Sequence, residues 1–359
     1  MKNTTRPRRR GGLRVAVAAL AALVVTGLGG APVAAADGGN HGAATAAPAI
    51  STTSPAAAGP GGDDVSPMIV GGERAPEAYA GAGSIQLLKN GVPDWHTCSG
   101  ALIHPSFVVT ASHCLSVMPP APQREGKAGE AGEVAWRAFQ QAPSPRRAGV
   151  GAQAEPQDPS QYTLRIGSTN RHSGGAVRGV RSISLPQPWE WGVPDGDGFI
   201  WDLTLIQLDH PVPGWMVKPA KLGYPRVGKQ TRIIGWGVTD PDPAQWGAPA
   251  PRWLRQLDVP IAPDGDCAEA GIGRGEICLG TSPGGGTACS GDSGGGALQR
   301  HGRDWVLTGL GSRSHTQSCV SSTVYTKVAE PRFLLWMVRT MHERDPHTRV
   351  TRADLTLAG

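Results

Sequence analysis

The sequence has little net charge once its first 36 residues are set aside. The formal net charge of the chain is +5, and residues 1–36 carry six positive and no negative side chains. Residues 37–68 contain three aspartates and no basic residue, so residues 69–359 have a net charge of only +2. Nucleic acids and anionic membranes attract strongly basic surfaces. We therefore predict neither a nucleic acid nor a membrane as a partner of the mature chain.

The chain also lacks an apolar run that is long enough to cross a membrane. A basic start precedes an apolar run from Val15 to Leu28, and the small residues 34–36 stand before Asp37. A membrane-spanning helix needs about 20 apolar residues, which disfavours a membrane anchor. A basic start, a short apolar run and small residues after it are typical of a secretory signal peptide. We therefore predict that residues 1–36 are a signal peptide and that the protein is secreted and extracellular.

No two cysteines have the C-x-x-C spacing, and no histidines have the paired spacing of zinc ligands. The six cysteines all lie beyond the predicted signal peptide: Cys98, Cys114, Cys267, Cys278, Cys289 and Cys319. An even number of cysteines in an exported chain favours disulfides over free thiols. We therefore expect three disulfides rather than a zinc site.

Two segments lack the apolar side chains or the periodicity of a folded core. Residues 37–68 are rich in Ala, Gly, Pro, Ser and Thr, so they cannot bury enough surface to offset their chain entropy. We predict that they form a disordered propeptide. Residues 117–160 are rich in Pro, Ala, Gly, Gln and Arg, and so long a structureless loop is unusual in a compact domain. We predict a disordered, solvated insertion there, with partner binding as the alternative.

Short apolar runs alternate with turn residues through the rest of the chain. Asn90-Gly91 between two such runs is typical of a β-hairpin. We expect further strands at residues 162–167, 180–185, 202–208, 231–237, 305–310 and 323–328. Residues 333–341 are largely apolar without Gly or Pro, and Pro331 suits a first helical turn. We therefore predict a carboxy-terminal helix.

The segment Thr287–Gly296 contains the groups that acyl transfer requires. Ser293 offers a hydroxyl, the neighbouring glycines let backbone N–H groups face a developing oxyanion, and Asp292 places an acid beside them. A Gly/Ser turn is the alternative, because the chain has 51 glycines and short motifs often occur by chance. Serine is a poor nucleophile at neutral pH, so catalysis would also require a histidine base and a carboxylate elsewhere.

Two upstream residues are candidates for the base and the carboxylate. His113 follows the apolar run Phe107–Val109 and precedes Cys114, and Asp202 stands at the head of an apolar strand. The alternatives are a structural or exposed histidine and a solvent-exposed aspartate at a strand end. Three tryptophans in the loop before this strand receive no role: Trp189, Trp191 and Trp201.

Four stretches together resemble the chymotrypsin-like (trypsin-fold) serine proteases. They are Ile69–Gly72, Cys98–Cys114, Asp202–Leu208 and Thr287–Gly296, and the resemblance extends from Ile69 to about Met341. It implies an all-β fold of two antiparallel six-stranded β-barrels with a carboxy-terminal α-helix. We expect the protease domain at residues 69–345, followed by a polar, frayed tail at residues 346–359.

The resemblance also implies roles for the candidate residues. His113 would be the general base, Asp202 would orient it, and Ser293 would be the nucleophile, in the chain order of chymotrypsin. The backbone N–H groups of Gly291 and Ser293 would form the oxyanion hole. Such an enzyme hydrolyses polypeptide substrates, as a secreted serine endopeptidase, without a metal ion or an organic cofactor. We expect a monomer.

In this family an Ile-Val-Gly-Gly start is exposed by cleavage of a zymogen. The resemblance therefore implies that the new amino group of Ile69 pairs with Asp292 and switches the enzyme on. Met68 stands where many members have a basic residue, so the sequence leaves the activating protease open.

The resemblance further implies the disulfides Cys98–Cys114 and Cys289–Cys319, and we pair Cys267 with Cys278 across a short loop. It also places substrate-binding residues around a specificity pocket. Thr287 would lie at the pocket base, Ser312 and Ser314 along one strand, and Thr323 where glycine usually opens the pocket. Arg313 departs from the usual tryptophan. Because Thr287 carries no charge to pair with a substrate Arg or Lys, we predict that cleavage is not trypsin-like. Because Thr323 should narrow the pocket, we predict a preference for small or medium apolar side chains before the cleaved bond (P1).

Two other function classes remain as alternatives. Gly291–Gly295 also matches the G-x-S-x-G elbow of α/β-hydrolases, which would make the protein a secreted esterase or lipase. That fold requires a helix after the serine and a histidine downstream, whereas three glycines follow Ser293 and the best base is upstream. The second alternative is an inactive binding module of the protease fold, in which Arg313, Thr323 and the insertion block the cleft.

Overall fold

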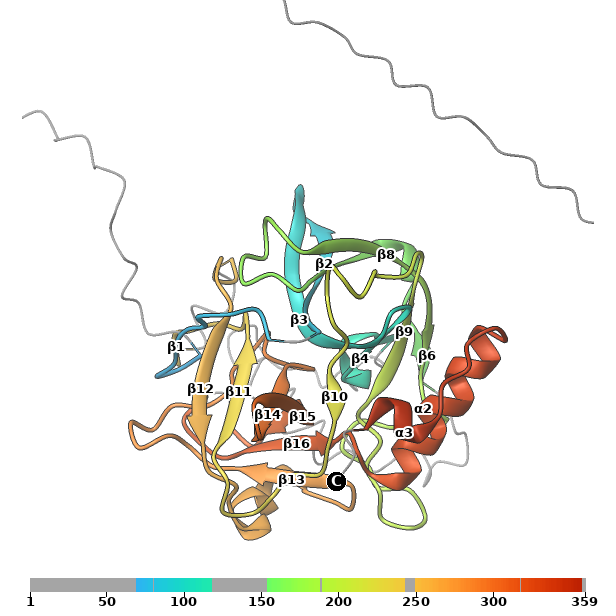
Figure 1. Cartoon of the computed structure of the whole chain (residues 1–359). Coiled ribbons are helices and arrows are strands. Elements are labelled where there is room, and N and C mark those ends of the chain that lie inside the picture. Colours follow the sequence, from blue (N-terminus) through green and yellow to red (C-terminus); the bar gives the residue numbers. More distant parts are fainter. Residues whose placement is uncertain are drawn as a thin grey trace, which may run out of the picture. The chain divides into compact units, whose positions relative to one another are not determined.

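The computed structural model describes residues 69–79, 81–117, 154–187, 189–242, 249–316 and 318–356. All of them belong to one compact unit, which consists mainly of strands (Figure 1). The predicted signal peptide, the predicted propeptide and most of the predicted insertion lie outside the described residues. Within the described part of the chain, no helix is long and apolar enough to span a membrane.

Six antiparallel strands close into a first barrel, in the order β2-β3-β4-β9-β8-β7 (Figure 1). They are β2 (Ala82–Lys89), β3 (Val92–His104), β4 (Phe107–Thr110), β7 (Tyr162–Ile166), β8 (Ala176–Ser184) and β9 (Thr204–Leu208). Apolar side chains of these strands, among them Ile85, Leu102 and Ile206, fill the barrel and are fully buried. Asn90 and Gly91 have φ values of 52° and 77°, as a two-residue hairpin turn requires. The predicted hairpin is thus confirmed as the β2–β3 connection.

A second sheet has the order β1-β12-β11-β14-β15-β16-β13, and β10 pairs in parallel with β15. Its strands are β1 (Glu73–Arg74), β10 (Lys221–Leu222), β11 (Thr231–Gly235), β12 (Arg255–Val259), β13 (Glu276–Leu279), β14 (Gly296–His301), β15 (Asp304–Ser314) and β16 (Thr323–Lys327). Just after β12, an isolated bridge joins Ile261 to Leu279 of β13. The second barrel expected from the sequence therefore consists of six strands, β11 to β16, whose ends meet at one bridge rather than along a full ladder.

One apolar core joins the barrel to the second sheet. It contains Phe107 and Leu205 from the barrel, Trp236 and Leu307 from the second sheet, and Phe333 from α2 (Pro331–Arg344). Three segments next to this core carry the predicted catalytic residues. They are the 3-10 turn η1 (Ser112–Cys114) after β4, the residues before β9 and the residues before β14. Packing of the core therefore sets the distance between these segments.

Both ends of the predicted insertion have defined structure. β5 (Ser116–Val117) pairs with β6 (Glu155–Pro156), and the turn η3 (Pro159–Gln161) follows. The backbone N–H of Gln157 donates to the carbonyl of Leu115 over 2.8 Å. Residues 154–160 are thus held by backbone pairing, so the predicted boundaries of 117–160 extend too far toward the carboxyl end.

The predicted carboxy-terminal helix is present as α2, which begins at Pro331 and buries Phe333, Leu334, Met337 and Met341. The segment after it differs from the frayed tail that its polar composition predicts. A second short helix, α3 (Arg352–Leu355), has a capping box between Thr351 and Asp354. Val350 and Leu355 are buried. Both side chains pack into the apolar core that α2 also joins, and they help to hold this segment in place.

Candidate active site

His113 and Asp202 form a hydrogen-bonded pair at the edge of the first barrel. His113 Nδ1 lies 2.8 Å from Asp202 Oδ2, and the backbone N–H of His113 donates to Asp202 Oδ1 over 3.1 Å. An ionised carboxylate can only accept hydrogen bonds, so Nδ1 carries a proton and Nε2 is the nitrogen left to exchange a proton with a substrate or nucleophile. The imidazole therefore has the tautomer that a general base requires.

Asp202 is almost completely buried, with 1% of its surface exposed. Burial raises the pKa of a carboxyl group. The charge of His113, with hydrogen bonds from His113 and Ser312, outweighs burial and lowers the pKa of Asp202 below its ordinary value. The hydroxyl of Ser312 donates to Asp202 Oδ2 over 2.6 Å. Asp202 is thus ionised at neutral pH and can stabilise an imidazolium.

Ser293 and His113 line the same pocket, which has a volume of about 290 Å³. The carbonyl of Ser293 accepts a hydrogen bond from the backbone N–H of Ser99 in β3 over 2.8 Å, which ties the serine segment to the first barrel. No hydrogen bond joins Ser293 Oγ to His113 Nε2 among the residues that the structure describes. Such bonds are often long in unliganded active sites and shorten when substrate binds. The pocket therefore places the Ser293 side chain and the His113 imidazole on one surface.

The backbone of the serine segment offers two unpaired donors. Among the described residues, the N–H groups of Gly291 and Ser293 have no hydrogen-bond partner, whereas those of Asp292 and Gly294 donate to Cys289 and Gly311. Gly291 has a φ of 89°, which a residue with a side chain rarely adopts. The positive φ thus helps to leave two N–H groups available for a developing oxyanion.

A buried histidine that the sequence analysis did not identify supports this backbone. His96 Nε2 donates to the carbonyl of Gly291 over 2.9 Å, and His96 Nδ1 lies 2.8 Å from Ser84 Oγ. Burial lowers the pKa of His96 to about 4, so the imidazole is neutral. It therefore holds the peptide after Gly291 in place. No motif surrounds His96 in the sequence, so only the fold identifies it.

Asp292 is buried at the pocket lining. Its carboxylate accepts hydrogen bonds from the backbone N–H groups of Gly237 and Cys289, over 2.8 and 2.9 Å. No cationic side chain of the described residues forms an ion pair with it, and burial raises its pKa to about 7. Ile69 is also buried, among apolar side chains that include Ala288. Its φ of 37° is unusual for a β-branched residue.

The pocket wall contains three of the four predicted substrate-binding residues: Ser312, Ser314 and Thr323. The fourth, Thr287, does not line the pocket. It is buried behind the wall, where its hydroxyl lies 3.0 Å from that of Thr323. Ser314 Oγ donates to the carbonyl of Thr316 over 2.6 Å. Thr287 therefore acts on the pocket through Thr323.

One of the three unassigned tryptophans lies at the pocket. The ring of Trp191 meets that of His113 edge to face, with 4.2 Å between the ring centroids. Trp189 and Trp201 are buried in the apolar core instead. Arg313 also lines the pocket, but its guanidinium forms a buried ion pair with Glu276.

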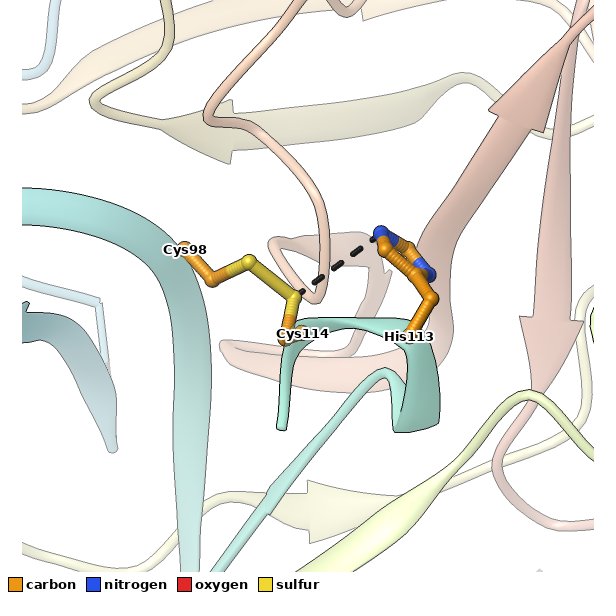
Figure 2. A group of neighbouring side chains, drawn as sticks. All are labelled: Cys98, His113 and Cys114. Atoms are coloured by element: carbon orange, nitrogen blue, oxygen red, sulfur yellow. Dashed lines mark hydrogen bonds between the residues drawn. A yellow bond between two sulfur atoms is a disulfide. The ribbon is translucent and has the colours of Figure 1, made fainter. Parts of the chain in front are cut away.

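All three predicted disulfides are present: Cys98–Cys114, Cys267–Cys278 and Cys289–Cys319. The first joins β3 to η1 directly beside His113 (Figure 2). Potential ligand atoms of Cys98, His113 and Cys114 lie within 4.8 Å of one another. Both sulfur atoms are bonded to each other, however, so neither can supply the thiolate that zinc binds. This cluster therefore serves to hold the histidine loop.

The sequence profile described as Trypsin matches residues 69–136 and 154–337 of the chain. The chain belongs to the trypsin family. The match omits residues 137–153, which lie inside the predicted insertion. Family membership confirms the resemblance and, with the strand-rich architecture, the all-β fold class.

Two relatives illustrate how far the similarity extends. Human granzyme M is 26% identical over 222 residues, which cover 60% of this chain and 65% of granzyme M. The structure of mouse neuropsin, a serine protease expressed in the limbic system of the brain, matches with a TM-score of 0.51 and 22% identity. That match covers 76% of this chain and 99% of neuropsin, and it supports the fold alone.

Proposed function

We propose that this trypsin-family protein is a secreted serine endopeptidase that hydrolyses peptide bonds through an acyl-enzyme on Ser293. The main observation is the partly buried hydrogen bond of 2.8 Å between His113 Nδ1 and Asp202 Oδ2, beside a pocket that Ser293 also lines. Polypeptides are the proposed substrates, and a monomer is the proposed state.

The proposed reaction follows the geometry of these groups. His113 Nε2 takes the hydroxyl proton while Ser293 Oγ attacks the substrate carbonyl carbon, and the N–H groups of Gly291 and Ser293 bind the oxyanion. The protonated His113 then donates its proton to the leaving amine, which leaves an ester on Ser293. Water, deprotonated by His113, hydrolyses this ester and restores the free enzyme.

The two alternatives differ in how they fit the fold. A G-x-S-x-G hydrolase carries its serine between a strand and a helix, whereas here Ser293 precedes the strand β14. An inactive binding module would require a blocked cleft. In the described residues the guanidinium of Arg313 is bound to Glu276, and the pocket beside Ser293 retains a volume of about 290 Å³.

Covalent labelling tests the proposed activity. We expect a sulfonyl fluoride to modify Ser293 stoichiometrically in a chain that begins at Ile69, because His113 activates that hydroxyl alone. Intact-mass measurement and peptide mapping would locate the label, and Ser293→Ala is the control that should remain unlabelled. Absence of label in the chain starting at Ile69 would favour the inactive binding module.

We propose that the protein is made with a signal peptide at residues 1–36 and a propeptide at residues 37–68, as a zymogen. Cleavage before Ile69 would create an amine for Asp292, whose buried carboxylate pairs with no cation of the described residues. It would also release Ile69 from its unusual backbone conformation.

We also propose a preference for small or medium apolar P1 side chains. Thr323 lines the pocket, and its hydrogen bond to the buried Thr287 holds its side chain in place. Among the described residues that line the pocket, Asp292 is buried and accepts two backbone N–H groups, and Arg313 is paired with Glu276, so neither attracts a basic side chain.

Replacement of Thr323 by Gly tests this preference. We expect kcat/KM for a Phe P1 substrate to rise relative to an Ala P1 substrate by roughly 10–200-fold, the range for a pocket that gains or loses apolar contacts. A panel of peptide anilides that differ at P1 measures the ratio. Thr323→Val is the matched control, since it keeps the side-chain volume and should leave the ratio nearly unchanged. An unchanged ratio in Thr323→Gly would contradict the proposed wall.

A further inference from the structure

Arg313 uses all of its hydrogen-bond donors inside the protein. Its Nε donates to the carbonyl of Ala270 over 2.8 Å, and Nη2 donates to the carbonyl of Gly271 over 2.8 Å. Nη2 and Nη1 also donate to the two carboxylate oxygens of Glu276, over 2.8 and 2.6 Å. The remaining donor of Nη1 lies 3.1 Å from Ser312 Oγ. A guanidinium has five N–H donors, so each of them has one acceptor here.

Glu276 neutralises Arg313 in the interior. The side chains of Arg313 and Glu276 are 4% and 0% exposed. Glu276 Oε2 also accepts the backbone N–H of Gly273 over 2.9 Å. Charges of opposite sign that are this deeply buried remain only when paired and hydrogen-bonded. Arg313 therefore offers substrates no free charge, although it stands on the pocket strand β15.

Arg313 and Asp202 together fix the position and direction of the Ser312 hydroxyl, because the ionised carboxylate of Asp202 can only accept a hydrogen bond. Arg313 can only donate hydrogen bonds, so Ser312 Oγ must accept from Nη1 and has its own proton left to donate. That proton goes to Asp202 Oδ2, 2.6 Å away, which in turn accepts from His113 Nδ1. Hydrogen bonds in such a chain polarise one another. The chain therefore runs without a break from Glu276 to the imidazole.

We propose that Arg313, held by Glu276, is a positioning residue that keeps Ser312 donating to Asp202 and so fixes the carboxylate that orients His113. This inference deepens the proposed function and rests on it. All five hydrogen bonds of the guanidinium go to Ala270, Gly271, Glu276 and Ser312, and none goes to His113, Asp202 or Ser293. Arg313 therefore acts on the catalytic pair through Ser312. Lysine could not replace it, because an ammonium has three donors and no planar fork to bind Glu276 at two points.

A second ion pair, which is partly buried, provides a comparison within the same chain. Arg232 binds Asp258 at two points, over 2.7 and 2.6 Å, and also donates to Tyr79 Oη. None of these residues contacts the catalytic pair. Loss of the Arg232 pair should therefore affect stability without affecting catalysis, which distinguishes a structural role from a positioning role.

The test is a double-mutant cycle between Ser312→Ala and Arg313→Met in the chain that begins at Ile69. We expect Arg313→Met to lower kcat for a peptide amide about tenfold, which corresponds to about 1.4 kcal/mol, with KM changed by less than about twofold. In the Ser312→Ala background, Arg313→Met should lower kcat by less than about twofold, because the hydroxyl through which it acts is gone. Arg232→Met is the matched control and should leave kcat unchanged.

Arg313→Met leaves Glu276 buried without its partner and could prevent folding. The variant Arg313→Met/Glu276→Met removes both charges, and apolar replacement of a whole buried pair is often neutral for stability. We expect this variant to retain the wild-type Tm but to show the same drop in kcat. A wild-type kcat in the Arg313→Met/Glu276→Met variant would overturn the inference. So would an equal drop in kcat on Arg313→Met in the wild-type and Ser312→Ala backgrounds. If the wild-type chain itself neither cleaves peptides nor reacts at Ser293, the proposed function fails, and the inference fails with it.

Discussion

Replacement of Asp202 by Asn is expected to lower kcat about 10⁴-fold, the loss seen when a triad histidine is held in the wrong tautomer. An asparagine amide can donate to His113 Nδ1, where the carboxylate can only accept. The imidazole proton then moves to Nε2, which can no longer take the proton of Ser293. The measurement is kcat for a peptide amide in the chain that begins at Ile69.

Asp209→Asn is the control for this substitution. Asp209 lies just after β9 and is partly exposed, and it accepts the backbone N–H of His210 over 2.7 Å. It has the same chemistry as Asp202 but does not contact His113, so its replacement should leave kcat within about twofold of the wild type. If Asp202→Asn retained more than about a tenth of the wild-type kcat, His113 could not be the base that Asp202 orients.

Cleavage before Ile69 is expected to raise kcat/KM by roughly 10²–10⁴-fold, since breaking a buried ion pair costs about 3–5 kcal/mol. The new amine would supply the cation that the buried Asp292 carboxylate lacks among the described residues. The matched variant is Asp292→Asn, which should hold the cleaved chain at the activity of the uncleaved chain. Equal activity before and after cleavage would refute the switch.

The stability of the uncleaved chain provides an independent measurement of Asp292. In the folded chain Asp292 keeps its proton up to a pH of about 7, whereas its ordinary pKa is 3.8. Between these values the unfolded chain binds fewer protons, so the free energy of unfolding falls as the pH rises, by roughly 4 kcal/mol in all. Denaturant unfolding at several pH values measures this, and Asp292→Asn should flatten the dependence.

Much of the site could be predicted because its motifs are local. The segment Thr287–Gly296 contains a nucleophile, an acid and glycines within a few residues. Asn90-Gly91 forms its hairpin because positive φ at two successive residues is a local property. The buried face of α2 follows from the spacing of its apolar residues. In each case the physical cause acts between residues that are close in sequence.

Other parts of the site depend on residues far apart in the chain. His96 supports the carbonyl of Gly291 only because β3 packs beside the serine segment. The interpretation of Arg313 as a departure that could block the cleft changes once its partner is known, because Glu276 binds the guanidinium in a buried ion pair beside a pocket that remains open. Val350 and Leu355 order a segment whose composition predicted fraying. The residues next to each of these side chains in the sequence do not indicate which distant part of the folded chain it will contact.

The sequence by itself determined the candidate residues His113, Asp202 and Ser293 and the family resemblance, since these depend on short motifs. The all-β class and the disulfides Cys98–Cys114 and Cys289–Cys319 followed from that resemblance. Tertiary structure decided how those residues are connected. A hydroxyl proton or a guanidinium donates to whichever acceptor the packed core brings within about 3 Å. For this reason the chain of hydrogen bonds from Glu276 through Arg313 and Ser312 to Asp202 became visible only in the folded protein.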